Sequence, residues 1–353
     1  MSAAVVITRY DVAPSELQTL LSGNKEGGGI RFVHVSHGEG APEDTNLVLM
    51  ARKDADARRC LVELSKSGYY AYCTMEGCTR FVRSDRVETL WLKVKSGDFI
   101  MTKDELVYTV TPPADGRKPA RLLVVFSSIH ENPNSASLHR YFTQNFPSIQ
   151  KYIPQDTAVL RIGDLGGVLG AFYLNTAHRP GNAAAVQKLI VSMRIQLGVD
   201  PDAMVLYGAS KGGTAAFYHG MLGGHRFVAV DPIVADEHYV KNIQDFHFTV
   251  GGVFPETKEQ VFERFVREIR SRKGRIPPST KHTVICSERS PQFRYISKML
   301  IDPLRDRIAF FNSRNPAILD HPDVGKHTVN TATMLLNMQL YGLQILPGVT
   351  DID

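Results

Sequence analysis

Short apolar runs alternate with longer amphipathic stretches from residue 121 onward. The runs have continuous apolar centres, as in strands buried on both faces of a sheet, and the longer stretches have the length and period of helices. The predicted strands are 121–128, 157–164, 204–207, 226–232, 282–288 and 307–313, and the predicted helices are 182–197, 213–222, 258–272 and 334–341. Strands separated by helices predict a doubly wound, mostly parallel sheet and therefore an α/β fold.

The first 115 residues follow a different pattern. Strand-like runs at 30–36, 46–51, 69–75, 88–94 and 104–110 surround one predicted helix, 55–67, with Gly68 just beyond its end. Residues 111–116 are rich in Pro and Gly and predict a linker. We therefore expect a small α+β domain at 1–115, with an accessory or substrate-binding role, and a second domain at 116–353.

Three further features of the sequence bear on where a ligand could bind. The insertion at about 233–281 is longer than an ordinary crossover, and we expect it to cap the carboxyl ends of the strands. Its basic run, 267–281, fits either a solvated face or a contact with an anionic donor. Four aromatic residues of the first domain fit core packing better than a sugar-stacking platform: Tyr69, Tyr70, Tyr72 and Trp91.

One predicted strand leads directly into the G-x-S-x-G pattern Gly208-Ala209-Ser210-Lys211-Gly212, and a helix follows. A strand, a sharp turn and a helix are the surroundings that a nucleophile elbow requires, so Ser210 is the candidate nucleophile. A side chain at Gly208 or Gly212 would collide with the neighbouring strand or helix. The alternative is a glycine-rich turn that packs a helix or binds phosphate, and Lys211 favours that interpretation.

The partners of such a serine follow it in the chain, first an acid and then a histidine. His321 and His327 both come after the last predicted strand. We expect His327 to be the base, because it precedes the terminal helix whereas Pro322 biases His321 toward an extended conformation; His321 is the alternative. We expect Glu288, after the penultimate strand, to be the acid, with Asp231 after the preceding strand as the alternative.

Two backbone N–H groups are expected to form an oxyanion hole. One belongs to Lys211, the residue after the nucleophile, at the start of a helix. The other belongs to the end of the strand at 121–128 or the loop after it, where Ser127, Ser128 and Ile129 are the candidates.

The sequence VLYGASKGGTAAFYHG at 205–220, preceded by LRIGDLGG at 160–167 and GAFYLNT at 170–176, carries a family resemblance. It resembles the α/β-hydrolase-like proteins of bacterial surface-glycan pathways. These are the capsular-polysaccharide biosynthesis proteins of the XcbB/CpsF type and the glycan O-acetyltransferase component of accessory Sec systems. The resemblance covers about residues 120–340, and the N-terminal region matches only loosely.

This resemblance implies an α/β-hydrolase fold for 116–353 and a Ser–Glu/Asp–His triad that transfers an acyl group to a sugar hydroxyl. The triad maps onto Ser210, Glu288 and His327. The resemblance also implies that Arg161, Asp164 and Tyr173 lie near a substrate. The chain departs from the family pattern because it lacks a clear secretory or membrane-associated partner region.

Composition narrows the function further. The 353 residues are 43% hydrophobic and 22% charged, which is ordinary for a globular protein, and the net charge of +5 fits an anionic substrate. No apolar run approaches the roughly 20 residues of a membrane span. The N-terminus does not resemble a secretory signal, and the sequence has no clear nucleic-acid-binding motif. Four cysteines without a paired C-x-x-C set favour reduced thiols in the cytoplasm over zinc or disulfides.

We therefore expect a cytoplasmic serine acyltransferase with no metal and no permanently bound cofactor. Its donor would be an activated acyl group such as acetyl-CoA, and its acceptor a hydroxyl of a glycan or related metabolite. A serine esterase with the same triad is the first alternative. A non-catalytic scaffold that binds glycan or protein and keeps the elbow as structure is the second.

Overall fold

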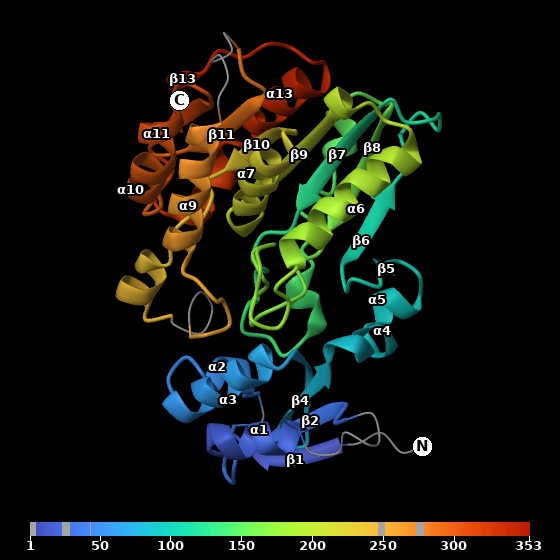
Figure 1. Ribbon diagram of the computed structural model, residues 1–353, viewed down its shortest axis with the longest axis vertical. Helices are drawn as coiled ribbons and strands as arrows, with labels where there is room; N and C mark the ends of the chain where they lie inside the picture. The colour runs from blue at the N-terminus through green and yellow to red at the C-terminus, as the bar shows by residue number, and fades with distance from the viewer. Residues whose placement is uncertain (1–4, 23–28, 43, 246–250, 273–278) are drawn as a thin grey trace.

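Strands of the chain form two sheets in the computed structural model, which describes residues 5–22, 29–42, 44–245, 251–272 and 279–353. Within these residues the smaller sheet has the strand order β1-β2-β4-β3, and the larger has the order β13-β12-β11-β10-β9-β7-β8-β6-β5. In Figure 1 the smaller sheet lies at the blue, N-terminal end of the molecule, below the larger one.

The larger sheet is mostly parallel, because only β6 runs against both of its neighbours, β5 and β8. Its strands are β5 (Ile100–Met101), β6 (Val107–Thr111), β7 (Arg121–Phe126), β8 (Thr157–Ile162), β9 (Met204–Ala209), β10 (Arg226–Val230), β11 (His282–Cys286), β12 (Ala309–Ser313) and β13 (Gly348–Ile352). With helices on both faces, this is an α/β-hydrolase-like fold, which confirms the predicted fold class.

The two faces of this sheet are both buried, as its continuous apolar strands predicted. In β7, Leu122 and Val124 pack into one hydrophobic cluster, and Leu123 and Val125 into another, because alternate side chains point to opposite faces. The first cluster is covered by α6 (Asn182–Leu197), α7 (Lys211–Gly223) and α9 (Lys258–Ser271). The second is covered by α12 (His321–His327) and α13 (Val329–Leu340).

The smaller sheet packs its core against short helices. Its elements and those that follow it are β1 (Val5–Arg9), α1 (Pro14–Ser22), β2 (Phe32–Ser36), α2 (Leu47–Met50), α3 (Ala55–Lys66), β3 (Tyr69–Met75), β4 (Cys78–Arg83), α4 (Val87–Leu90) and α5 (Leu92–Lys95). A two-residue turn joins β3 to β4. Glu76 and Gly77 both have positive φ there, 55° and 66°, as a type I′ hairpin turn requires.

Several predictions for the first 115 residues are wrong. Residues 46–51 and 88–94 were expected as strands, but they contain α2, α4 and α5. Asn46 caps α2 by accepting a hydrogen bond from the N–H of Leu49, a local contact that outweighs strand propensity. The strand expected at 104–110 is present as β6, but it pairs with the larger sheet. The break between the two sheets therefore lies between β4 and β5, before residue 115.

Most of the aromatic group proposed as a stacking platform belongs to the core. Tyr69, Tyr70 and Trp91 are buried, and only Tyr72 is half-exposed. The edge-on contact of Tyr70 with Tyr141, with ring centroids 5.6 Å apart, joins the smaller sheet to the chain beside the larger one. These rings therefore hold the two parts of the chain together.

The insertion at 233–281 was expected to cap the carboxyl ends of the strands, and its main helix, α9, lies on one face of the sheet instead. Its helix α9 packs against α7 through Phe262 and Phe217, whose ring centroids are 6.0 Å apart. Residues 273–278 of the basic run 267–281 lie outside the described residues. No helix in the described ranges is both long and apolar enough to cross a membrane.

Helix α7 contains a histidine that folding keeps neutral. His219 is fully buried, where its Nε2–H donates to the Tyr173 carbonyl at 3.0 Å and its Nδ1 accepts from Gln187 Nε2 at 3.1 Å. Burial lowers the pKa of His219 from 6.5 to about 4. Between these values the unfolded chain binds the proton more strongly than the folded chain, so protonation favours unfolding.

We predict that the free energy of unfolding falls as the pH is lowered from 6.5 toward 4, with His219 contributing on the order of 3 kcal/mol. Denaturant titrations at several pH values measure this loss. His219→Gln should have a shallower pH dependence over the same interval, because the side chain no longer titrates. An unchanged slope in that variant would assign the acid sensitivity to other groups.

Candidate active site

The turn between β9 and α7 holds Ser210 in a strained backbone conformation. Ser210 has φ 58° and ψ −122°, which is rare for any residue other than glycine. A Cβ at Gly208 would lie 2.1 Å from the Gly212 carbonyl oxygen, and a Cβ at Gly212 would lie 2.6 Å from the Phe126 carbonyl oxygen. Both contacts are impossibly short, so the turn requires glycine at these two positions, as the sequence predicted.

Ser210, His321 and Asp231 form one hydrogen-bonded chain. The Ser210 Oγ and His321 Nε2 are 2.8 Å apart, and the His321 Nδ1 and Asp231 Oδ2 are 2.7 Å apart. In the tautomer that fits, Ser210 donates to Nε2 and Nδ1–H donates to the carboxylate. The three residues follow β9, β12 and β10, so they meet at the carboxyl edge of the parallel strands.

The carboxylate of Asp231 is fixed from two sides. It is almost completely buried, and its Oδ2 also accepts a hydrogen bond from Ser290 Oγ at 2.6 Å. Its backbone has φ 43°, and its N–H donates to the Ile285 carbonyl. Two hydrogen bonds on one oxygen, together with this backbone anchor, leave Asp231 little freedom to turn away from His321.

Glu288 was expected to be the acid, and the structure contradicts this. Its side chain is exposed, and its backbone N–H donates to Asn312 Oδ1 at 2.9 Å. The loop after β11 turns so that Ser287 and Ser290 point inward, and Ser290 is the residue that reaches Asp231. The loop after β11 therefore supplies a hydroxyl that supports the acid, while the acid itself follows the preceding strand, β10.

His327 was expected to be the base, and the structure places the alternative, His321, beside Ser210 instead. His321 is the first residue of α12 and His327 the last, about 9 Å further along the helix axis. Pro322 does not keep His321 out of a helix, because proline is well tolerated in the first turn of a helix, where N–H groups lack partners anyway. Asp320 caps α12 in a capping box with Asp323, a signal visible in the sequence D-H-P-D.

A cavity of about 700 Å³ adjoins the serine. Its lining comes from the loop after β7, the ends of β9 and β10, and α12: Ser128, Ile129, His130, Glu131, Pro133, Asn145, Phe146, Tyr207, Ala209, Ser210, Val230, Asp231, Tyr239, His321, Pro322, Gly325, Lys326 and Val329. From the described part of the 233–281 insertion, only Tyr239 reaches this cavity. Burial raises the pKa of Tyr239, and neighbouring carboxylates including Asp231 raise it further, so its hydroxyl stays protonated.

Four backbone N–H groups were expected as candidates to bind an oxyanion, and the structure reduces them to two. The N–H of Ser127 donates to the Tyr173 hydroxyl at 2.7 Å, and the N–H of Ser128 donates to Asn145 Oδ1 at 2.7 Å. Both donors are therefore engaged. Ile129 lines the cavity, and Lys211 is the first residue of α7, where an N–H has no partner within the helix. Lys211 and Ile129 are the remaining candidates of the expected four.

The side chain of Lys211 points away from the cavity into a buried ion pair. Its Nζ lies 3.0 Å from Asp164 Oδ2 and donates to the Leu169 carbonyl at 3.0 Å. Asp164 also accepts the N–H groups of Phe172 and Tyr173, both of which have positive φ. The Lys211 side chain therefore links the elbow to the 164–173 loop. It does not point into the cavity, where the alternative interpretation required it to bind phosphate.

The residues expected near a substrate share this structural role. Arg161, Asp164 and Tyr173 are buried, and none of them lines the cavity beside Ser210 in the part of the chain that is described. Arg161 donates to the Phe146 carbonyl at 3.2 Å. The Tyr173 hydroxyl donates to the Ile162 carbonyl at 2.7 Å and accepts the N–H of Ser127. Two of the three motifs that carry the family resemblance, 160–167 and 170–176, thus support the site through buried contacts and do not line its cavity.

No protein-family model and no curated protein matches this sequence. Among solved structures, the chain is similar to the glycosylation-associated protein complex Gap123 of Streptococcus agalactiae, with 14% identity and a TM-score of 0.47. The match covers 69% of this chain and 46% of that one, so this chain spans just under half of its length.

Two smaller proteins also align with this chain. The fluorophosphonate-binding serine hydrolase FphF of Staphylococcus aureus aligns at 13% identity over 68% of this chain and 96% of its own, with a TM-score of 0.44. An arylesterase aligns at 14% identity over 86% of this chain and 100% of its own, also with a TM-score of 0.44.

We predict that removing one charge of the buried pair destabilises the protein. Asp164→Asn leaves the Lys211 ammonium buried without a counterion and should lower the free energy of unfolding by about 3–5 kcal/mol. Denaturant titration of the single and double variants with Lys211→Met gives the coupling energy. Lys188→Met, which breaks the exposed pair with Asp104, is the matched control and should cost less than about 1 kcal/mol. Equal losses at the two pairs would contradict the assignment.

Proposed function

We propose that this chain is a serine-dependent acyl-transfer enzyme in which Ser210 is the nucleophile, His321 the base and Asp231 the acid. The observation that carries the proposal is the hydrogen-bonded chain Ser210–His321–Asp231, which ends at a cavity. This arrangement has the recognised geometry of a nucleophile, a base and an orienting group. The strained elbow supports it, because such backbone strain clusters at functional sites.

In the first half of the reaction, Ser210 Oγ attacks the carbonyl carbon of an acyl donor while its proton passes to His321 Nε2. Asp231 holds the imidazole in the tautomer whose Nε2 is free to accept that proton and stabilises the imidazolium that forms. The N–H groups of Lys211 and Ile129 stabilise the developing oxyanion. The tetrahedral intermediate collapses, the bond to the leaving group breaks, and His321 returns the proton to that group. An acyl-serine remains.

In the second half, an acceptor hydroxyl attacks the acyl-serine and gives its proton to His321, which returns it to Ser210 Oγ. We propose that the acceptor is a hydroxyl of a glycan or related metabolite. His130, Glu131 and Asn145 line the cavity and can hydrogen-bond a polyhydroxylated molecule. Lys326 lines it as well and offers a positive charge to an anionic donor such as acetyl-CoA.

Hydrolysis is the same chemistry with water as the acceptor. A specific observation favours it as the second candidate: in the described part of the 233–281 insertion only Tyr239 lines the cavity, so these described residues offer the acyl-enzyme little cover from water. The non-catalytic scaffold gains no comparable support, because a scaffold has no need of a histidine aligned between Ser210 and a buried carboxylate.

We predict that Ser210→Ala and His321→Ala each lower kcat for p-nitrophenyl acetate by roughly 10⁶-fold, and Asp231→Asn by roughly 10⁴-fold. His327→Ala and Glu288→Gln are matched controls, because both residues lie close in the chain to the site without contacting Ser210. They should retain activity within about threefold of the wild type. Labelling by a fluorophosphonate should be lost in Ser210→Ala, strongly slowed in His321→Ala, where the serine has no base, and retained in His327→Ala. Loss of activity in His327→Ala with full activity in His321→Ala would overturn the assignment.

We predict that a hydroxylated acceptor accelerates breakdown of the acyl-enzyme. The acetyl-enzyme formed from p-nitrophenyl acetate can be followed by intact mass, in buffer and with a panel of methyl glycosides. A true acceptor should shorten the lifetime of the adduct at least tenfold and appear as its acetyl ester. If every glycoside leaves the lifetime unchanged while the serine remains reactive, the protein is a hydrolase.

A further inference from the structure

A basic cavity lies at the opposite edge of the larger sheet from Ser210. It has a volume of about 440 Å³ and lies where β10 and β11 begin and where α7 and α9 end. Its lining residues are Met221, Arg226, Ile269, Arg272, Ser279, Thr280, Lys281, His282, Arg307, Gly342, Leu343 and Gln344. A strand of five residues such as β10 is about 17 Å long, so this cavity is remote from the cavity at the carboxyl edge.

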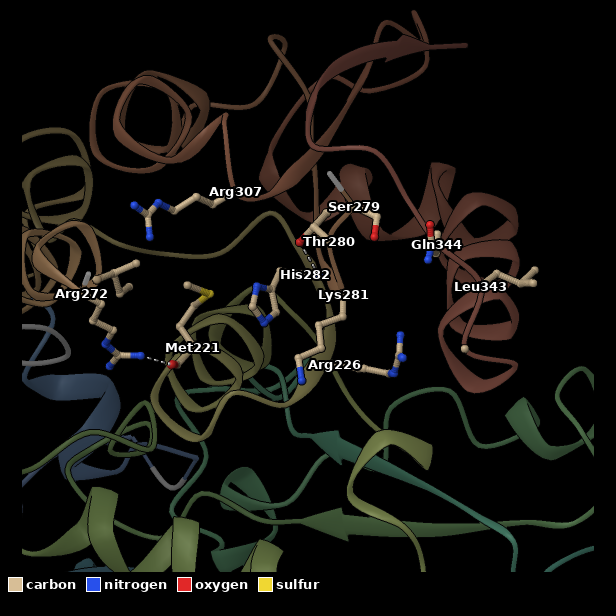
Figure 2. A pocket seen from close by; sticks show the side chains of 12 residues that line it. Met221, Arg226, Arg272, Ser279, Thr280, Lys281, His282, Arg307, Leu343 and Gln344 are labelled. Atoms are coloured by element: carbon tan, nitrogen blue, oxygen red, sulfur yellow. Dashed lines mark hydrogen bonds between the residues drawn. The ribbon is translucent and has the colours of Figure 1, made fainter. Parts of the chain in front are cut away.

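Four cationic side chains converge on this cavity from separate segments: Arg226 at the start of β10, Arg272 after α9, Lys281 before β11 and Arg307 before β12. In Figure 2, Arg272 and Arg307 lie on one side of His282 and Met221, and Lys281 and Arg226 on the other. No acidic side chain lines the cavity among the described residues.

Acids outside the lining compensate only part of this charge. Lys281 Nζ is 3.6 Å from Asp202 Oδ1, whose side chain is 73% exposed, and Arg307 Nε is 3.9 Å from Asp306 Oδ2. Both acids are exposed, and ion pairs at these distances with an exposed partner contribute little. The cations at the cavity therefore keep most of their capacity to bind another anion.

The other two cations of the cavity, Arg226 and Arg272, hydrogen-bond neutral oxygens. Arg226 donates to the Asp202 carbonyl at 2.8 Å and to Gln339 Oε1 at 3.2 Å, and Arg272 donates to the Met221 carbonyl at 3.2 Å. These contacts orient the guanidinium groups without neutralising them. Each guanidinium has five N–H donors, so donors remain for a ligand.

His282 lies between the two groups of cations with an unused polar atom. Its ring stacks on Phe227, with centroids 5.1 Å apart, and its Nε2 is buried without a hydrogen-bond partner in the described structure. Burial lowers the pKa of His282 to about 3, and Lys281 and Arg226 add to the effect. The ring is therefore neutral, and it lies between the two groups of cations without adding charge to the cavity.

We propose that this cavity binds a small phosphorylated metabolite. Arginine matches phosphate geometry with paired N–H donors, and the groups on either side of His282 are placed to hold two phosphoryl groups or the two ends of one ligand. Met221, Ile269 and Leu343 offer apolar surface to the carbon skeleton. This inference is independent of the proposed acyl-transfer function.

The test is a calorimetric titration of the full chain with inorganic pyrophosphate, with sulfate at matched ionic strength as the comparison anion. We expect saturable binding with one site per chain and weaker binding of sulfate. Arg272→Gln and Arg307→Gln should each raise the Kd for pyrophosphate about tenfold or more, because each removes a charge-assisted hydrogen bond. Arg117→Gln removes the same charge from an exposed position elsewhere and should leave the Kd unchanged.

Three results for the wild type and the two site variants would overturn the proposal. These are the absence of saturable pyrophosphate binding by the wild type, an unchanged Kd in both site variants, and sulfate binding as tight as that of pyrophosphate. An equal rise in Kd in Arg117→Gln would assign the binding to general charge and would also overturn it. The thermal unfolding midpoint of each variant shows that it is folded, and the two site variants test the cavity independently.

Discussion

The close approach of three backbone segments around Ser210 is the constraint on which the site depends. Gly208 at the end of β9 nearly touches Gly212 in α7, and Gly212 lies against the carbonyl of Phe126 at the end of β7. This packing fixes the serine relative to the loop after β7, which includes Ile129 and lines one side of the cavity. The strained φ of Ser210 persists because these contacts leave the turn no other conformation.

A buried network extends this constraint away from the turn. The Lys211–Asp164 ion pair joins the first residue of α7 to the loop that follows β8, and Asp164 in turn holds two residues with positive φ. One of them, Tyr173, hydrogen-bonds the N–H of Ser127. The elbow and the candidate oxyanion loop are therefore tied together twice, once by backbone packing and once through side chains. Such a rigid frame is what a preorganised site requires.

The sequence alone predicted the fold and the nucleophile turn, because both depend on local signals. Continuous apolar strands, amphipathic helices and a glycine pair around a serine each leave a pattern in consecutive residues. The partners of the serine depend on which loops meet in space. Glu288 and Ser290 are two residues apart on the same loop, and only the path of that loop decides that Ser290 faces Asp231.

The base, by contrast, is marked by a local signal in the sequence. Asp320-His321-Pro322-Asp323 has a capping residue, a proline in the first helical turn and an acid at the third helical position, which together predict a helix that begins at His321. The bias of proline against a preceding helical residue is a tendency, and helix capping overrides it here. The aromatic residues between Tyr69 and Trp91 fitted either a core or a stacking surface for another reason. Whether an aromatic side chain is buried depends on contacts between segments that are distant in the sequence.

The parallel sheet separates two kinds of chemistry at its two edges. Between the basic cavity and the Asp231 carboxylate lie Phe227, Val228 and Ala229 of β10, all fully buried. A donor held by its phosphates at the amino edge could not bring its acyl group to Ser210 through this packed layer. Recognition of an anionic donor for Ser210 must therefore come from the carboxyl-edge cavity itself, where Lys326 is the available cation among the described lining residues. The cations at the amino edge therefore cannot serve the reaction at Ser210, which is why we assign their cavity a separate phosphorylated ligand.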